Sequence, residues 1–197
     1  MATIHVLDET TINKIAAGEV VERPASVVKE LIENSIDAGA TSIEVEIGEG
    51  GSAYMRITDN GKGMTEEDAR LAVLRHATSK IQNVEDLFDI ASLGFRGEAL
   101  ASIASVSHFV LTTRTVDQEL GTRILIDGGT FTDCIPYGAA PGTTIEVKEL
   151  FFNTPARRKF LKTERTESSK IQDIVGKLAL SNPHIAFKLT IDDRVAI

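Results

Sequence analysis

The segment between Pro24 and Ala40 constrains the fold most, because it predicts one amphipathic helix with both ends marked. Proline suits the first helical position, where its missing N–H costs nothing, and Gly39 suits the left-handed conformation that stops a helix. Between these ends, helical spacing gathers one broad apolar face, made of Val28, Leu31, Ile32, Ser35 and Ile36. We therefore expect a core helix between Pro24 and Gly39.

Polar side chains recur on the other side of this helix, about one turn apart. Glu30, Asn34 and Asp37 follow the pattern i, i+4, i+7 and so stack in one stripe. A carboxylate one turn from a carboxamide is suited to a general base beside a metal ligand. The same stripe is also typical of the solvated face of a core helix, and the spacing alone leaves both interpretations open.

Composition limits the class of protein. The chain has 197 residues, 42% of them hydrophobic. No apolar run is long enough to span a membrane, and the N-terminus lacks the basic segment and apolar run of a secretory signal. Cys134 is the only cysteine and the four histidines lack zinc-ligand spacing, so neither disulfides nor a zinc site is expected. We predict a soluble intracellular protein with no membrane partner. A net charge of −8 argues against a large DNA-binding surface in this segment.

Alternating apolar residues predict an antiparallel hairpin after the helix. Ile43, Val45 and Ile47 alternate with glutamates, a glycine-rich turn follows, and Met55 and Ile57 alternate on the return. Further strands are expected at about 107–114, 120–127, 130–137, 144–147 and within 184–197. Other helices are expected at 8–17 with an end at Gly18, at 65–74, near 84–88, at 99–106, after Asn153-Thr154-Pro155, and at 165–180, where Ile171, Ile174, Val175 and Leu178 point inward.

Two glycine-rich loops resemble ligand sites. Asp59 ends the return strand and opens the loop 59–64, where glycines let a ligand approach the backbone, although a plain turn explains the same pattern. The second loop begins at Gly94 and leads into a helix, which suits an anion at a helix N-terminus. Between them, 75–97 reads as a long irregular stretch, typical of a lid, in which Thr78, Ser79 and Lys80 suit phosphates. No Walker A motif occurs in the chain.

Three segments carry a resemblance to a known family. They are the helix 24–40, Arg75-His-Ala-Thr-Ser-Lys, and Gly94-Phe-Arg-Gly-Glu-Ala-Leu, within a likeness that runs from Ile15 to Phe160. The chain resembles the N-terminal ATPase domain of the MutL family of DNA mismatch repair proteins, which belongs to the GHKL (Bergerat-fold) ATPases. The resemblance implies an α/β two-layer sandwich, with helices on one face of a mostly antiparallel mixed sheet and ATP held between helices and lid.

The resemblance also implies site residues. Glu30 matches the general base, Asn34 the Mg²⁺ ligand, and Asp59 the carboxylate that accepts a hydrogen bond from the adenine amino group. Gly63 floors that pocket and Thr143 supports the adenine end. The remaining expected contacts with ATP are Asp37, Ala38, Met64, Thr78, Ser79, Lys80, Leu93, Gly94, Phe95, Arg96, Gly97, Glu98, Ala99 and Leu100.

The same resemblance implies cofactors and partners. We expect ATP and Mg²⁺, slow ATP hydrolysis, an ATP-dependent homodimer formed through about residues 1–23, and contacts with other mismatch repair proteins. The γ-phosphate lysine and most DNA contacts are expected from a second domain. We interpret residues 1–197 as one ATPase domain cut near the start of that domain, so that the fragment binds nucleotide but hydrolyses it poorly. Localisation is expected to be cytoplasmic and nucleoid-associated in a bacterium, or nuclear in a eukaryote.

Three alternatives remain open at this point. One is the ATP-binding domain of another GHKL enzyme, against which the segments 94–100 and 151–160 argue. Another is a nucleotide-dependent clamp without turnover, and the third is an acidic interaction domain whose loops bind nothing. The one basic segment, with Arg157, Arg158, Lys159, Lys162 and Arg165, is interpreted as a solvated helix face beside Glu164 and Glu167.

Overall fold

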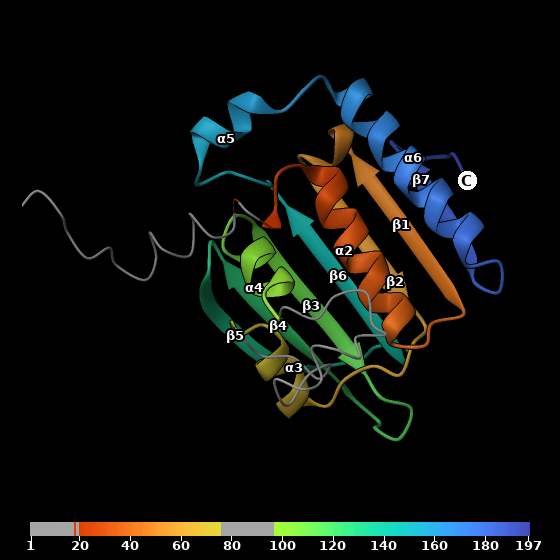
Figure 1. Ribbon diagram of the computed structural model, residues 1–197. Coiled ribbons are helices and arrows are strands. Elements are labelled where there is room, and N and C mark those ends of the chain that lie inside the picture. The colour runs from red at the N-terminus through yellow and green to blue at the C-terminus, as the bar shows by residue number, and fades with distance from the viewer. Residues whose placement is uncertain (1–17, 19, 76–96) are drawn as a thin grey trace, which may run out of the picture.

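The computed structural model describes residues 18, 20–75 and 97–197 (Figure 1). The expected helices at 8–17 and 84–88, and most of the irregular stretch 75–97, lie outside the described residues. Gly18 and Val20 are both helical, so the expectation that the first helix ends at Gly18 is wrong. A Cβ at Gly18 would overlap the guanidinium of Arg157. Glycine inside a helix costs only about 1 kcal/mol relative to alanine, so the helix can continue past Gly18.

The described chain forms a sheet of eight strands in the order β5-β4-β3-β6-β2-β1-β7-β8. Only β1 and β7 pair in parallel among these strands; every other neighbouring pair is antiparallel. The strands are β1 (Ser42–Gly48), β2 (Tyr54–Asp59), β3 (His108–Arg114), β4 (Gly121–Asp127), β5 (Thr130–Tyr137), β6 (Gly142–Lys148), β7 (Ala186–Ile191) and β8 (Arg194–Val195). The predicted strands are confirmed to within two residues at each end, apart from the last stretch, which forms two strands.

The helices pack on one face of this sheet, as Figure 1 shows for α2 and α4 in front of the strands. They are α2 (Pro24–Asp37), α3 (Glu66–Ala72), α4 (Ala99–Ala104) and α6 (Glu164–Ser181). Helix α5 (Pro155–Phe160) has no buried residue, and a short turn η1 (Glu49–Gly51) lies between β1 and β2. The predicted two-layer sandwich with a mostly antiparallel mixed sheet is confirmed. Among the described residues, no helix is both long enough and apolar enough to cross a bilayer.

The central helix forms as its sequence predicts. Pro24 occupies the first turn, α2 ends at Asp37, and Gly39 follows with a φ of 74°. Val28, Leu31 and Ile32 are fully buried against the sheet, together with the inward residues of β1 and β2. Burying one such aliphatic side chain stabilises the fold by about 1.5–3 kcal/mol, so this face fixes the helix on the strands.

The alternate positions of the strands carry charged pairs on the open face of the sheet. Arg56 of β2 donates to both carboxylate oxygens of Glu46 of β1 at 2.6 Å. Farther along, the Arg123 guanidinium lies 3.7 Å from the Glu146 carboxylate and 4.4 Å from the Tyr137 ring centroid. These pairs keep one face of the sheet polar and direct the apolar residues to the helices.

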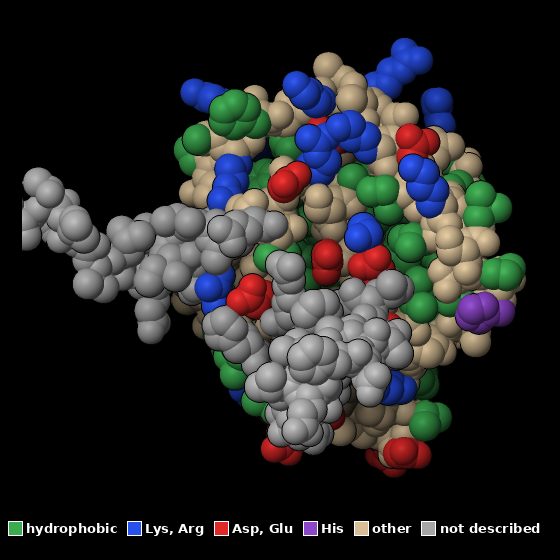
Figure 2. All heavy atoms as spheres, viewed as in Figure 1, with side chains coloured by type: hydrophobic (Ala, Val, Ile, Leu, Met, Phe, Trp, Pro, Cys, Tyr) green, Lys and Arg blue, Asp and Glu red, His purple; other side chains and the backbone are tan. Residues whose placement is uncertain are grey.

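The C-terminal helices differ in one respect from expectation, the burial of Glu167. Arg158, Lys159, Lys162 and Arg165 are exposed, and Lys and Arg side chains gather over the upper part of the face in Figure 2, where α5 and the start of α6 lie. Glu167, however, is 2% exposed and not solvated. It accepts the Lys162 backbone N–H at 3.0 Å and lies 3.8 Å from the Arg23 guanidinium, and so joins α6 to the start of α2. Helix α4 also ends at Ala104, two residues earlier than predicted.

Candidate functional site

The candidate site is built around Asp59, the last residue of β2. Its side chain lies on the helix-covered face of the sheet and is 8% exposed. The Ser35 hydroxyl of α2 donates to Oδ2 at 2.8 Å, and the Gly61 backbone N–H donates to Oδ1 at 2.8 Å. A carboxylate has about four lone-pair positions, so these bonds leave capacity to accept a donor from a ligand.

Burial and hydrogen bonding act on the Asp59 carboxyl in opposite directions. Burial, the larger cause, raises its pKa above the ordinary aspartate value because the charged form loses hydration. Hydrogen bonds from Gly61, Ser35 and the Thr143 backbone favour the charged form and lower the pKa. A buried carboxyl with a perturbed pKa at a strand end is typical of a binding site.

The loop after Asp59 is anchored to two neighbouring segments, at Thr41–Ser42 and at Ala38. The Asn60 carboxamide oxygen accepts the backbone N–H groups of Thr41 and Ser42 at 2.9 Å each. The Lys62 N–H donates to the Ala38 carbonyl at 3.0 Å, which ties the loop to the C-terminal end of α2. At Gly61 an added Cβ would lie 2.9 Å from the Ala38 Cβ, so only glycine fits this approach comfortably.

Glycines also allow the loop after Asp59 to pack closely against the first residue of β6 and the last residue of β3. Gly63 has a φ of 67°, and a Cβ there would overlap the Arg114 carbonyl group. Gly142, at the start of β6, has a φ of 119°, and a Cβ there would overlap the Asp59 carbonyl. The predicted role of glycine as a point of close approach therefore applies here to packing of the loop on neighbouring backbone.

Thr143 and Met64 are linked through the hydroxyl of Thr113, near Asp59. Thr143 pairs directly with Asp59 across β6 and β2, so the two side chains share one face of the sheet. The Met64 N–H donates at 2.9 Å to the hydroxyl of Thr113 on β3, which lies 3.0 Å from the Thr143 hydroxyl. The structure thus brings together Ala38, Asp59, Gly63, Met64 and Thr143 of the expected site.

The polar stripe of α2 lies on the same helix as Ser35. Glu30, Asn34 and Asp37 are all half-buried, so they are neither fully exposed to solvent nor part of the core. Asn34 precedes Ser35, whose hydroxyl contacts Asp59, and Asp37 precedes Ala38, whose carbonyl accepts from the loop. The stripe therefore runs along α2 beside the Asp59 end of the site.

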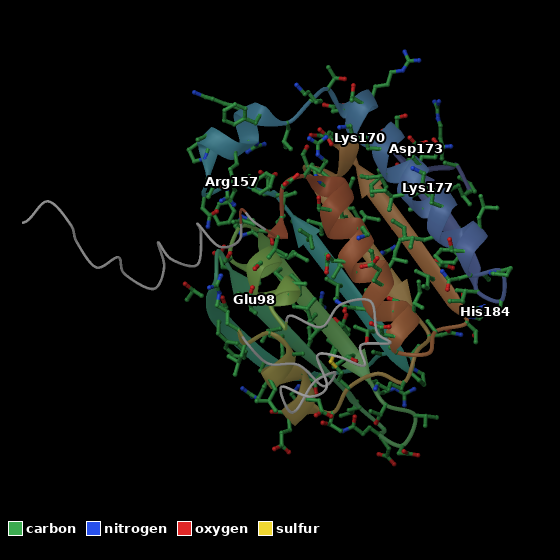
Figure 3. All side chains as sticks on the ribbon, viewed as in Figure 1. Glu98, Arg157, Lys170, Asp173, Lys177 and His184 are labelled. Carbon is green, nitrogen blue, oxygen red and sulfur yellow. The ribbon has the colours of Figure 1, made fainter. Side chains whose placement is uncertain are left out.

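The second glycine loop is described only at its end. Gly97 has a φ of 63°, and Glu98, Ala99 and Leu100 follow it, half-buried, at the start of α4. Figure 3 labels Glu98 there, on the same face of the sheet as α2. Thr78, Ser79, Lys80, Leu93, Gly94, Phe95 and Arg96 lie outside the described residues.

Sequence reasoning missed two polar members of this site. Ser35 fits the apolar face by spacing, yet its hydroxyl bonds both the Leu31 carbonyl at 3.1 Å and Asp59. A serine on an otherwise apolar helix face was the available signal, because a buried hydroxyl needs a partner. Thr113 gave no such signal, since threonine is ordinary in a strand and its partners come from distant segments.

The donor set defines the ligand chemistry that the site can recognise. Asp59 suits an amino group, and a neighbouring hydroxyl can donate to or accept from the next atom of the same ligand edge. The edge of adenine that carries its amino group presents this pair of functions.

No three His, Cys, Asp or Glu side chains form a metal cluster among the described residues. A Mg²⁺ ion held by the Asn34 carboxamide, waters and phosphates needs no such cluster, and oxygen donors suit it.

Comparison with known proteins identifies the class. The model of the histidine kinase-, DNA gyrase B- and HSP90-like ATPase family matches residues 22–127, more than half of the chain. This chain belongs to that family. The match covers α2, the Asp59 loop and the strands up to β4, and so includes most of the site described above.

Among the proteins to which the chain is similar are bacterial DNA mismatch repair proteins. The chain is 59% identical over 195 residues to the DNA mismatch repair protein MutL of Caldanaerobacter subterraneus subsp. tengcongensis, covering 99% of this chain and 33% of the relative. It is 57% identical over 195 residues to MutL of Desulforamulus reducens, covering 99% and 30%. A solved structure, the Aquifex aeolicus MutL ATPase domain complexed with ADP, matches with a TM-score of 0.72 and 38% identity, covering 90% of this chain and 63% of that one. The resemblance inferred from the motifs is confirmed, and the chain spans about a third of the length of the curated relatives it matches.

Proposed function

We propose that this chain binds ATP with Mg²⁺ and hydrolyses it slowly, as the ATPase part of a DNA mismatch repair protein whose subunits associate when ATP is bound. One observation carries the proposal: a buried Asp59 carboxylate, held by Ser35 and Gly61 beside Thr143, in a chain of an ATPase family. The ADP complex of the Aquifex aeolicus relative supports a nucleotide as the ligand.

Asp59 accepts the adenine amino group in this proposal. Its burial strengthens the bond because water does not compete for the carboxylate there. A nucleotide with a carbonyl in place of the amino group meets the lone pairs of Asp59 with its own, which is repulsive. The site should therefore prefer ATP to GTP.

The reacting end of ATP lies along the α2 stripe in this proposal. Glu30 takes a proton from the water that attacks the γ-phosphorus; the new P–O bond forms as the bond to the β,γ-bridging oxygen breaks, and ADP leaves. The carboxamide of Asn34 would hold Mg²⁺, which supplies charge neutralisation for the phosphates. Residues 97–100 lead into α4 with backbone N–H groups that suit phosphate oxygens.

Partners follow from the longer relatives. We propose that a second domain supplies a lysine to the γ-phosphate and most contacts with DNA, so that these 197 residues bind nucleotide but hydrolyse it poorly. The net charge of −8 is in keeping with a weak direct role in DNA binding. We likewise propose that the ATP-dependent homodimer and the contacts with other mismatch repair proteins are properties of the whole protein.

Calorimetric titration with ATP, ADP and GTP, each with and without Mg²⁺, tests the proposal. We expect one site per chain, a preference for ATP over GTP, and tighter ATP binding with Mg²⁺. Binding without any base preference would remove Asp59 from base recognition. Absence of nucleotide binding would leave an interaction domain and contradict the proposal.

A further inference from the structure

The loop after Asp59 begins with Asn60-Gly61, the only Asn-Gly pair in the sequence. Asparagine followed by glycine deamidates more readily than other asparagine pairs, because glycine has no side chain to keep its backbone nitrogen away from the carboxamide. Asn60 is exposed, so water reaches it. The loop that carries the proposed adenine contact therefore also carries a pair of residues whose own chemistry can alter its backbone.

Deamidation at this pair needs no reagent other than water. The Gly61 nitrogen attacks Cγ of Asn60, a C–N bond forms, and the bond from Cγ to Nδ2 breaks; ammonia leaves and carries off the amide proton of Gly61. Water then adds to either carbonyl of the five-membered imide. One product is aspartate with the original backbone. The other is isoaspartate, in which the backbone runs through the former side chain.

The folded structure holds both reacting groups in other contacts. Asn60 Oδ1 accepts the backbone N–H groups of Thr41 and Ser42 at 2.9 Å each, and Nδ2 donates to the Thr41 hydroxyl at 2.9 Å. The Gly61 N–H donates to Oδ1 of Asp59 at 2.8 Å, and this nitrogen must lose its proton to react. Ring closure turns the carboxamide onto Gly61 and gives up these contacts, so it proceeds from an opened loop.

The two products differ in their effect on the loop. Aspartate keeps an oxygen for the N–H groups of Thr41 and Ser42, and the Thr41 hydroxyl can turn to donate to the new second oxygen. Isoaspartate places that carbonyl in the backbone, so the two N–H groups lose their acceptor. It also lengthens the backbone before Gly61 by one carbon, where an added Cβ would already lie 2.9 Å from the Ala38 Cβ. Only isoaspartate therefore displaces the Gly61 N–H from Asp59.

We propose that Asn60 is a deamidation site that its contacts with Thr41 and Ser42 keep unreacted, and whose conversion to isoaspartate removes nucleotide binding. Protection of Asn60 follows from the hydrogen bonds, and the effect on nucleotide rests on the proposed function. The modification acts once, in a chain whose loop has opened, and withdraws that chain from the population that binds nucleotide.

Mass spectrometry of the tryptic peptide 57–62 measures conversion of Asn60 during incubation at mildly alkaline pH. Folded wild type should convert at least about tenfold more slowly than the same chain in urea, the lower bound for three neutral hydrogen bonds. Thr41→Val removes the acceptor of Nδ2 and should speed conversion in the folded state by about 2- to 12-fold, with no change in urea. Thr41→Ser is the matched control, because it keeps the hydroxyl, and should convert as wild type does.

Ageing of folded Thr41→Val tests the effect on nucleotide. The molar ratio of ADP bound, by calorimetry with Mg²⁺, should fall from the fresh to the aged sample by the fraction of chains that contain isoaspartate. Asn60→Asp represents the other product and should still bind ADP. Thr41→Ala replaces the valine variant if that one does not fold.

Three results would overturn this inference alone. They are equal conversion of Asn60 in folded and urea-unfolded wild type, an unchanged folded-state rate in Thr41→Val, and isoaspartate-containing chains that bind ADP normally. Fresh wild type that binds no nucleotide would instead overturn the proposed function, and with it the predicted effect of isoaspartate on nucleotide, while the predicted rates of conversion would stand.

Discussion

Replacing Asp59 by asparagine should weaken ATP binding while leaving the fold as stable or more stable. The substitution keeps the shape and exchanges one acceptor oxygen for an NH2 donor. Gly61 offers only an N–H, so the amide oxygen must face it; the Ser35 hydroxyl can turn to accept from the NH2. The bonds to Gly61 and Ser35 therefore survive the substitution, and the main loss falls on the ligand.

The size of the loss follows from the charge that is removed. A hydrogen bond to a charged group contributes about 1.5–3 kcal/mol, which corresponds to a loss of about 10- to 150-fold in ATP affinity. Calorimetry with ATP and ADP measures it, and thermal unfolding of the same samples shows whether the fold is intact. An Asp59→Asn variant that binds ATP as tightly as wild type would refute the reasoning.

The pH dependence of stability has an unusual sign for this aspartate. Burial raises the folded-state pKa of the Asp59 carboxyl above its ordinary value of about 4, so this carboxyl holds its proton more tightly in the folded state than in the unfolded state. The stability from this group is present below the unfolded pKa and is lost as pH rises through the raised folded pKa. Between pH 4 and 7, wild type should therefore gain stability relative to Asp59→Asn as the pH falls, in urea unfolding without nucleotide. A wild type that instead loses stability relative to the variant would contradict the sign.

Three further predictions concern other parts of the molecule. In the longer protein, Glu30→Gln should lower ATP hydrolysis by about 10²- to 10⁴-fold and change ATP affinity only slightly, by a steady-state assay and calorimetry; near-normal turnover would exclude Glu30 as the base. Gly63→Ala should lower thermal stability, because its φ is 67° and its Cβ would overlap a backbone carbonyl, whereas Gly138→Ala, with nothing within 4 Å, should not. Glu167→Ala should destabilise the fold by about 1–3 kcal/mol because it leaves the Lys162 backbone N–H without its acceptor and the Arg23 guanidinium without its nearby carboxylate, while the exposed Glu164→Ala should stay within about 0.5 kcal/mol; equal effects would disprove that role.

Local pattern accounts for most of the elements. The periodicity of β1 and β2, the proline and glycine that bound α2, and the Thr65–Asp68 cap of α3 are all signals within a few residues. The Thr65 hydroxyl accepts the Asp68 N–H at 3.1 Å, as an N-cap residue does. Such signals survive in the fold because the tertiary contacts agree with them.

The remaining features depend on distant contacts that no local pattern carries. Burial of Glu167 depends on packing of α6 against η1, where a Cβ on Gly50 would lie 2.9 Å from the Glu164 backbone. The parallel pairing of β7 with β1 joins segments about 140 residues apart, and the roles of Ser35 and Thr113 arise only where α2, β3 and β6 meet. The roles of Glu30 and Asn34 stay predictions, since they depend on bound ATP.

The central claim is that a nucleotide binds beside Asp59, and the most direct test is to map the residues that it contacts. A two-dimensional amide NMR titration with ADP and Mg²⁺ reports on each backbone N–H separately. We predict the largest shift changes at Ser35, Gly61, Met64 and Thr143, and little change at Asp173 on the exposed side of α6. Saturable changes centred on another surface, with those four amides unmoved, would contradict the account.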